Sequence, residues 1–171
     1  EAIPGHHYQL SLQQENTELP EFLHPESMGV FVEGWALYAE SLGRELGLYK
    51  DPIQYFGMLS MEMHRAIRLV VDTGIHSKGW TREQAIQYSL DNEAESEESV
   101  IAEIERYMAT PGQALSYKIG QLKIRELRTK AETKLGDKFS VTEFHNQVLN
   151  SGSLPLVLLE AKIDNWINSQ I

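Results

Sequence analysis

The sequence contains no cysteine, which excludes a disulfide framework and a metal site built from thiolates. It also has no apolar run approaching the roughly 18 residues of a membrane span. Basic residues are few, with 15 Lys and Arg against 25 Asp and Glu and a net charge of −10. Nucleic acids and anionic membrane surfaces reward clustered Lys and Arg, so this balance disfavours both as the main partner.

An initiating methionine is also missing, because the chain opens with Glu1 in EAIPGHHYQL. We interpret this as the loss of an upstream segment, and we expect that missing N-terminal part of the same protein to be a partner. A signal peptide or lipid anchor would belong to such a segment. The 171 residues, of which 42% are hydrophobic, suit a core of their own, so we expect a single helical domain over residues 1–171.

Helical periodicity and helix-capping patterns run through the chain. Apolar residues at helical spacing predict long helices over 28–47 and 52–76, and a loop with two prolines precedes the first of them. Start signals predict the remaining helices, over 82–90, over 99–108, from the TPGQ sequence at 110–113 to about 135, from 140 and from 155. No convincing pair of strands is present. The predicted fold class is therefore all-α.

Glu33 is the only charged residue in the stretch MGVFVEGWALYA. A helix that is apolar on every side is buried, and a buried carboxylate must be paired, hydrogen-bonded or bound to a metal. One interpretation is an ion pair with Arg65 or Arg68. The other is a metal site in which Glu33 joins the imidazoles of His6 and His7, because zinc favours nitrogen and oxygen ligands of this kind.

A polar stripe follows one face of the otherwise apolar helix predicted over 52–76. At about 100° per residue, Arg65, Arg68, Asp72 and His76 share this face. One interpretation is a solvated face with an Arg68–Asp72 ion pair. In the functional interpretation the arginines bind carboxylates, and His76 donates a hydrogen bond to a polarised oxygen.

The stretch TPGQALSYKIG combines a helix start with several small residues, which permit the close approach of another backbone. Gln113 and Tyr117 have a plain structural interpretation as a capping residue and a packing residue. In the functional interpretation, Tyr117 presents its hydroxyl to a site as an oxyanion donor.

Four blocks, EAIPGHHYQ, FVEGWALYAE, RLVVDTGIHSKGWTREQAI and RYMATPGQALSYKIG, together resemble the bacterial domain-of-unknown-function family 885 over nearly the whole chain. The resemblance implies a gluzincin-type zinc metallopeptidase, related in pattern to the HExxH enzymes. It also implies that the chain is the C-terminal part of a larger helical fold. The family's opening block reads HEAxPGHH, so this chain starts at its second letter and lacks the first histidine. We therefore expect the fragment to be inactive on its own.

The resemblance implies roles at the matching positions. Glu1 would be the general base that takes a proton from water, His6 a Zn²⁺ ligand and Glu33 the carboxylate ligand. Pro4 stands where HExxH has its second histidine, and a proline breaks the helix there. His6 is preferred because it retains the Gly-His ending of lengthened versions of the motif. In an unbroken helix His7 would share the face of the missing histidine, so His7 stays an alternative ligand.

By analogy with other helical zinc peptidases, His76 and Tyr117 would stabilise the tetrahedral oxyanion. Arg65 and Arg68, from the polar stripe, would bind the substrate.

The function expected from the whole sequence is a zinc-dependent, peptidase-like hydrolase that acts on peptides or peptide-like substrates. Two alternatives remain, a non-catalytic binding protein that keeps the fold and a purely structural helical domain. Family resemblance favours a periplasmic or lipid-anchored location, and the residues alone leave a cytoplasmic one open.

Overall fold

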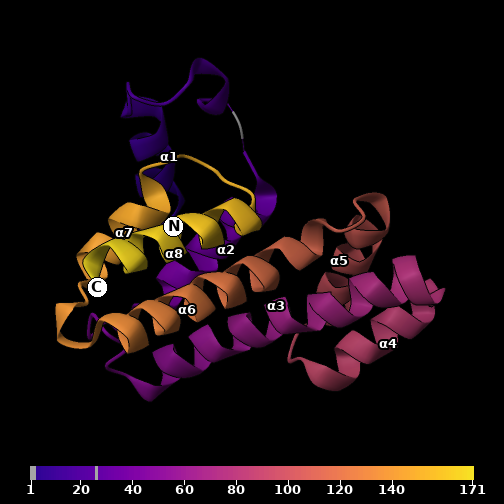
Figure 1. Cartoon of the computed structure of the whole chain (residues 1–171). Coiled ribbons are helices and arrows are strands. Elements are labelled where there is room, and N and C mark those ends of the chain that lie inside the picture. Colours follow the sequence, from indigo (N-terminus) through magenta and orange to yellow (C-terminus); the bar gives the residue numbers. More distant parts are fainter. Residues whose placement is uncertain (1–2, 26) are drawn as a thin grey trace. The chain divides into compact units, whose positions relative to one another are not determined.

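The computed structural model describes residues 3–25 and 27–171. Within these residues it contains eight α-helices, three short 3₁₀ helices and no β-strand, so the predicted all-α fold class is confirmed. In chain order the elements are α1 (His6–Glu15), η1 (Glu21–Leu23), α2 (Gly29–Ser41), α3 (Pro52–Lys78), α4 (Arg82–Asn92), α5 (Glu97–Ala109), η2 (Gln113–Leu115), α6 (Ser116–Leu135), η3 (Gly136–Lys138), α7 (Val141–Leu149) and α8 (Leu156–Gln170) (Figure 1).

Two helices differ from their predicted bounds by more than two residues at one end. The helix predicted over 28–47 ends at Ser41, and the chain then turns: the Leu48 N–H donates to the Gly43 carbonyl over 2.8 Å, and Gly47 has a φ of 68°. This left-handed region favours glycine and closes helical turns. The helix predicted after TPGQ begins instead with the 3₁₀ turn η2, and α6 follows it directly.

The predicted helix starts are confirmed where their caps are visible. Thr81 and Gln84 form the capping box of α4: the Gln84 N–H donates to the Thr81 hydroxyl over 3.2 Å, and the Thr81 N–H donates to Oε1 of Gln84 over 2.9 Å. Ser140 accepts from the N–H of Glu143 at the start of α7. These local bonds satisfy N–H groups that the first helical turn leaves without a partner.

The chain forms two compact units. The first unit comprises Glu1–Ser41 and Ile119–Ile171, and the second comprises Leu42–Lys118. The expected domain over 1–171 thus contains two clusters of internal contacts, and each is described separately below.

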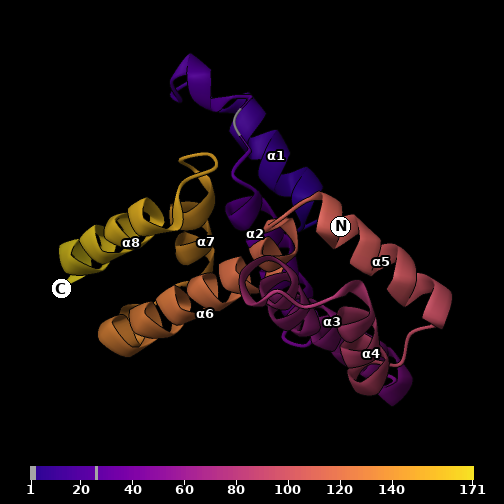
Figure 2. The ribbon, with the colours of Figure 1, turned by 90° about the vertical axis from the view of Figure 1, so that its right-hand side faces the viewer.

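Aromatic side chains from α2 and α7 form the centre of the first unit. The ring centroids of Trp35 and Tyr38 lie 5.5 Å apart on α2, and both rings contact His145 of α7. The Tyr38 hydroxyl and Nε2 of His145 are hydrogen-bonded at 2.8 Å. Figures 1 and 2 show α7 alongside α8, and α1 contacts both α2 and α7.

Gly34 of α2 and Gly120 of α6 bring two helix backbones into direct contact in the first unit. A Cβ added to Gly34 would lie 2.6 Å from the carbonyl carbon of Gly120, and a Cβ added to Gly120 would lie 2.6 Å from the Cα of Gly34. No larger residue fits without moving a helix. The close approach predicted for the small-residue start of this helix is therefore observed at Gly120.

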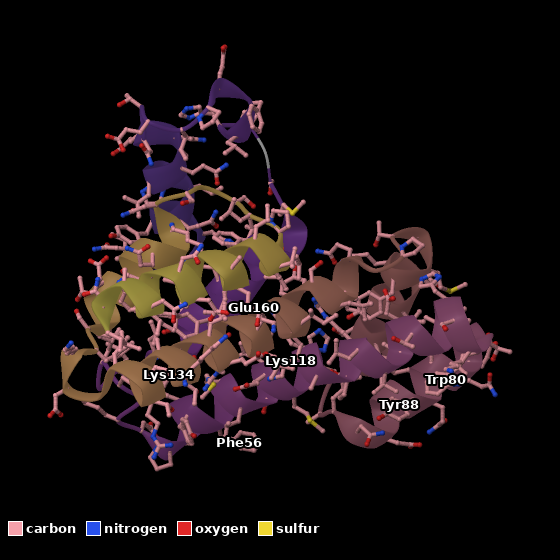
Figure 3. The ribbon with its side chains drawn as sticks, viewed as in Figure 1. Phe56, Trp80, Tyr88, Lys118, Lys134 and Glu160 are labelled. Atoms are coloured by element: carbon pink, nitrogen blue, oxygen red, sulfur yellow. The ribbon has the colours of Figure 1, made fainter. Side chains whose placement is uncertain are left out.

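The second unit is organised around α3, whose C-terminal half is covered by α4 and α5. The buried core of this unit comprises Ile67, Val71, Ala85, Ile86, Val100, Ile104, Tyr107 and Ala114. Trp80, in the turn before α4, lies with its ring centroid 5.5 Å from that of Tyr88; both are labelled in Figure 3. The indole packs on Gly74, where an added Cβ would lie 3.0 Å from its Cζ3 atom.

None of the helices within residues 3–25 and 27–171 combines the length and apolar character needed to cross a membrane.

We expect Gly34→Ala to lower the free energy of unfolding by about 1–3 kcal/mol, because the added methyl group overpacks the contact with Gly120. Chemical denaturation measures the change. Gly57→Ala in α3 is the matched control, because an added Cβ there has nothing within 4 Å. Alanine favours helix over glycine by up to about 1 kcal/mol, so the control should be neutral or stabilising. An equal effect of both substitutions would contradict the close-contact account.

Candidate metal centre and a charged network

The segment with the two adjacent histidines is tied to α2. Nε1 of Trp35 donates to the carbonyl of Pro4 over 2.8 Å, and Gly5, the residue before α1, is buried. The helix α1 begins at His6, two residues after Pro4, in agreement with the break expected at the proline. Because Trp35 and Glu33 both lie on α2, this contact holds the opening segment near Glu33.

His6 and Glu33 lie side by side. Nε2 of His6 is 3.3 Å from Oε2 of Glu33, and the side chains are 31% and 21% exposed, respectively. This proximity is the one expected if the two residues share a site. His7, the alternative ligand, is exposed. Glu1, expected as the general base, lies outside the described residues.

The geometry of the His6–Glu33 pair fits two ligands of one zinc ion. Ligand atoms about 2.0–2.2 Å from a tetrahedral zinc lie roughly 3.3–3.6 Å from one another. The observed 3.3 Å falls within this range. Within residues 3–25 and 27–171, no group of three or more His, Asp or Glu side chains is placed to hold a metal. The pair would supply two of the three protein ligands that a catalytic zinc site needs.

Two polar side chains on α1 have buried atoms without hydrogen-bond partners among the described residues. They indicate a polar site that these residues do not complete. Nδ1 of His6 is buried and has no hydrogen-bond partner among the described residues, although the outer nitrogen of a zinc-bound histidine normally donates to a second group. Gln9, which lies nearly one turn further along α1, is also buried, and neither atom of its amide has a partner in the described part of the chain. Gln9 was not among the residues selected from the sequence. Its only signal there is the spacing of three residues from His6.

The polar stripe on α3 is not a solvated face. Arg68 and Asp72 are both buried. Arg68 pairs with Glu103 of α5 over 2.9 Å, whereas Asp72 accepts from the Gly112 N–H over 3.1 Å. The Arg68–Asp72 ion pair considered from the sequence is therefore not formed, because each residue has a partner from a later segment of the second unit.

Glu103 is the centre of this charged network. It accepts a two-pronged pair of hydrogen bonds from Arg106, one from the Tyr107 hydroxyl over 2.7 Å and one from Arg68. The bonds from Arg106, together with the Tyr107 bond and the charge of Arg68, lower the pKa of Glu103 to about 2 against the opposing effect of burial. Burial and the bond to Glu103 raise the pKa of the Tyr107 hydroxyl.

His64 extends the network to Glu93. Nη2 of Arg68 donates to Nε2 of His64 over 2.9 Å, so the imidazole accepts at that nitrogen and carries its proton on Nδ1. Nδ1 then donates to the Glu93 carboxylate over 2.5 Å. His64, Glu93 and Glu103 were not predicted as site residues from the sequence. The spacing of four residues from His64 to Arg68 could have indicated their contact on one helix face. The contacts of Glu93 and Glu103 join residues 29 and 35 positions apart, and no sequence pattern indicates them.

The remaining site residues lie around the same network. The guanidinium carbons of Arg65 and Arg68 lie 5.5 and 4.9 Å from the ring centroid of Tyr117. The Tyr117 hydroxyl accepts from Nε2 of Gln113 over 3.3 Å. The structure thus brings three of the selected residues together. His76 is exposed, and its Nε2 donates to the carbonyl of Tyr107 over 2.9 Å, so that nitrogen is already engaged.

A comparison with protein families gives a match over residues 1–163 to a family described as bacterial protein of unknown function (DUF885). The chain belongs to this family. The family resemblance predicted from the four sequence blocks is thereby confirmed. A search of the curated proteins found no match for this DUF885 chain.

Two solved structures are similar to the DUF885 chain. The putative lipoprotein from Colwellia psychrerythraea is 49% identical with a TM-score of 0.96, and the match covers 99% of this chain and 29% of that chain. A putative lipoprotein of unknown function from Shewanella oneidensis is 28% identical with a TM-score of 0.85, and the match covers 94% of this chain and 29% of that chain. The DUF885 chain therefore spans less than a third of the length of either relative.

We expect Glu103→Gln to lower the free energy of unfolding at pH 7 by about 1–3 kcal/mol, the range for hydrogen bonds to a charged group. The folded-state pKa of Glu103 lies below the ordinary 4.5, so its carboxylate stabilises the fold above about pH 4.5 and this contribution is lost as the pH falls towards about 2. Urea unfolding of parent and variant should therefore show a difference that shrinks over this window.

Glu105→Gln is the matched control, because Glu105 forms an exposed ion pair with Arg82 and its loss should cost less than about 1 kcal/mol. A Glu103→Gln variant as stable as this control at pH 7 would show that the network contributes little.

Proposed function

We propose that the full-length protein is a zinc-dependent, peptidase-like hydrolase and that His6 and Glu33 are two of its metal ligands. The observation that carries this proposal is the 3.3 Å separation of Nε2 of His6 and Oε2 of Glu33, which equals the spacing of two ligands on one zinc ion. It is supported by the opening sequence EAIPGHH, which resembles a zinc-binding motif, in a chain that belongs to the DUF885 family.

A zinc ion held there would act as a Lewis acid towards water and a peptide carbonyl. Side chains of the protein would transfer the proton and stabilise the oxyanion. Glu1 would take the proton from the attacking water and return it to the leaving amine. By analogy with other helical zinc peptidases, Tyr117 would donate a hydrogen bond to the developing oxyanion.

The other proposed roles differ in their support. Arg65 lies over the ring of Tyr117 beside Arg68, which supports a role for Arg65 in binding a carboxylate of the substrate. Arg68 itself is buried and paired with Glu103, so its contribution would be to place Arg65 and Tyr117. His76 would stabilise an oxyanion only by giving up its bond to the Tyr107 carbonyl, which makes it the weaker of the two oxyanion candidates.

We also propose a location at the bacterial envelope through a lipid anchor outside these residues. The support is that both solved relatives carry the description of a lipoprotein.

The second candidate function is a binding or structural domain without catalysis. The charged network of the second unit favours it, because Glu103 pairs with both Arg68 and Arg106 within the fold. In that case the His6–Glu33 contact would be an ordinary ion pair, and metal would be irrelevant to stability.

Zinc binding by the full-length gene product separates the two candidates. We expect His6→Ala and Glu33→Gln each to weaken zinc binding by more than the roughly 10–100-fold that loss of an outer-shell partner costs. His7→Ala, the matched control at the neighbouring exposed residue, should leave the affinity unchanged. Calorimetric titration at constant pH measures all three. Loss of binding in His7→Ala alone would make His7 the ligand, and equal affinity in all variants would favour the structural alternative.

Peptide hydrolysis tests the role of Glu1. We expect Glu1→Gln in the full-length protein to keep its zinc and to lose about 10²–10⁴-fold in hydrolysis rate, the usual contribution of a general base. The rate is measured with a mixture of peptides, and zinc content is measured on the same sample. A variant that loses both zinc and activity would place Glu1 among the ligands instead.

A further inference from the structure

One face of α3 is covered along half of its length only. Ile67 and Val71 are 4% and 0% exposed beneath α4 and α5. Towards the N-terminal end of the same helix, Ile53, Phe56, Leu59 and Met63 are 77%, 66%, 43% and 48% exposed. At about 100° per residue, all six side chains fall within an arc of roughly 120°. They form one apolar face of α3. We call its exposed part, which comprises Ile53, Phe56, Leu59 and Met63, the open face.

The open face is hollowed at its centre. Figure 3 shows Phe56 pointing away from the ribbon of α3. A cavity of about 260 Å³ is lined by Phe56, Leu59, Ser60 and Met63 of α3 and by Asn92, Glu93, Ala94 and Glu95. Apolar side chains around a cavity bind an inserted apolar group better than a flat surface does, because they remove more of its area from water.

The rim of this cavity is strongly acidic. The stretch DNEAESEE at 91–98 carries five carboxylates and no lysine or arginine. Glu95 is exposed, whereas Glu93 is held by its bond to His64. An occupant that carries lysine or arginine beside its apolar side chains complements this rim.

We propose that the open face of α3 binds a segment of the same polypeptide that lies outside these 171 residues, and that this segment is apolar with flanking basic residues. Both solved relatives have more than two thirds of their length outside the matched part, so a longer chain has ample sequence to supply the occupant. Contiguous exposed apolar surface of this kind marks an interface in soluble proteins. This proposal is independent of zinc and of catalysis.

Cysteine labelling tests the proposal, because the chain has no cysteine of its own. Ser60→Cys places a thiol in the cavity with almost no change in size and leaves every apolar side chain of the open face in place. Gln54→Cys, on an exposed polar position of the same helix, is the matched control. Maleimide labelling is followed by peptide mass spectrometry, in the 171-residue chain and in the full-length gene product.

We expect the Ser60→Cys thiol to react at least tenfold more slowly in the full-length product than in the 171-residue chain, and the Gln54→Cys thiol to react equally fast in both. Adding Glu95→Lys to the full-length product should restore labelling of Ser60→Cys several-fold. Equal labelling of Ser60→Cys in both proteins would overturn the proposal. So would a labelling rate that falls as the concentration of the 171-residue chain rises, since a second copy would then be the occupant. No effect of Glu95→Lys would overturn the basic character of the segment.

Discussion

A carboxylate withdrawn from water needs a partner, and this constraint shapes both clusters of polar side chains. Glu103 meets it inside the second unit, where Arg68, Arg106 and Tyr107 donate to its two oxygens. Glu33 meets it in the first unit through its contact with His6. The two sites therefore differ in kind. The one at Glu103 is closed by the protein's own donors, and the one at Glu33 has capacity for a further partner.

The closed network changes which residues are available for chemistry. A buried arginine that gave its charge to a substrate would leave Glu103 without one of its three donors, at a cost of several kcal/mol. Arg68 is thus better suited to hold His64, Tyr107 and Tyr117 in place than to bind a ligand. Residues at the edge of the network, rather than those at its centre, are the ones that a substrate can reach without breaking the fold.

The sequence was sufficient for the features that depend on near neighbours. The capping box at Thr81, the break before His6 and the small residue at Gly120 each follow from residues a few positions apart. His6 and Glu33 are 27 positions apart, and no local rule connects them. Their ligand chemistry suggested a shared metal site, and the family resemblance assigned the two ligand roles. The partners of Arg68 and Asp72 could not be predicted from the sequence, because periodicity identifies the face of a helix and not the segment that packs on it.

Three features of the chain each lack a partner among the described residues. The proposed zinc pair lacks a third ligand among the described residues, Gln9 is buried without a partner there, and the open face of α3 has no cover along its N-terminal half. The charged network around Glu103, in contrast, has its donors and acceptors within one unit. The proposed third zinc ligand and the proposed occupant of the open face would both come from sequence outside these residues. The solved relatives, each more than three times as long as the part that matches, have further sequence of this extent.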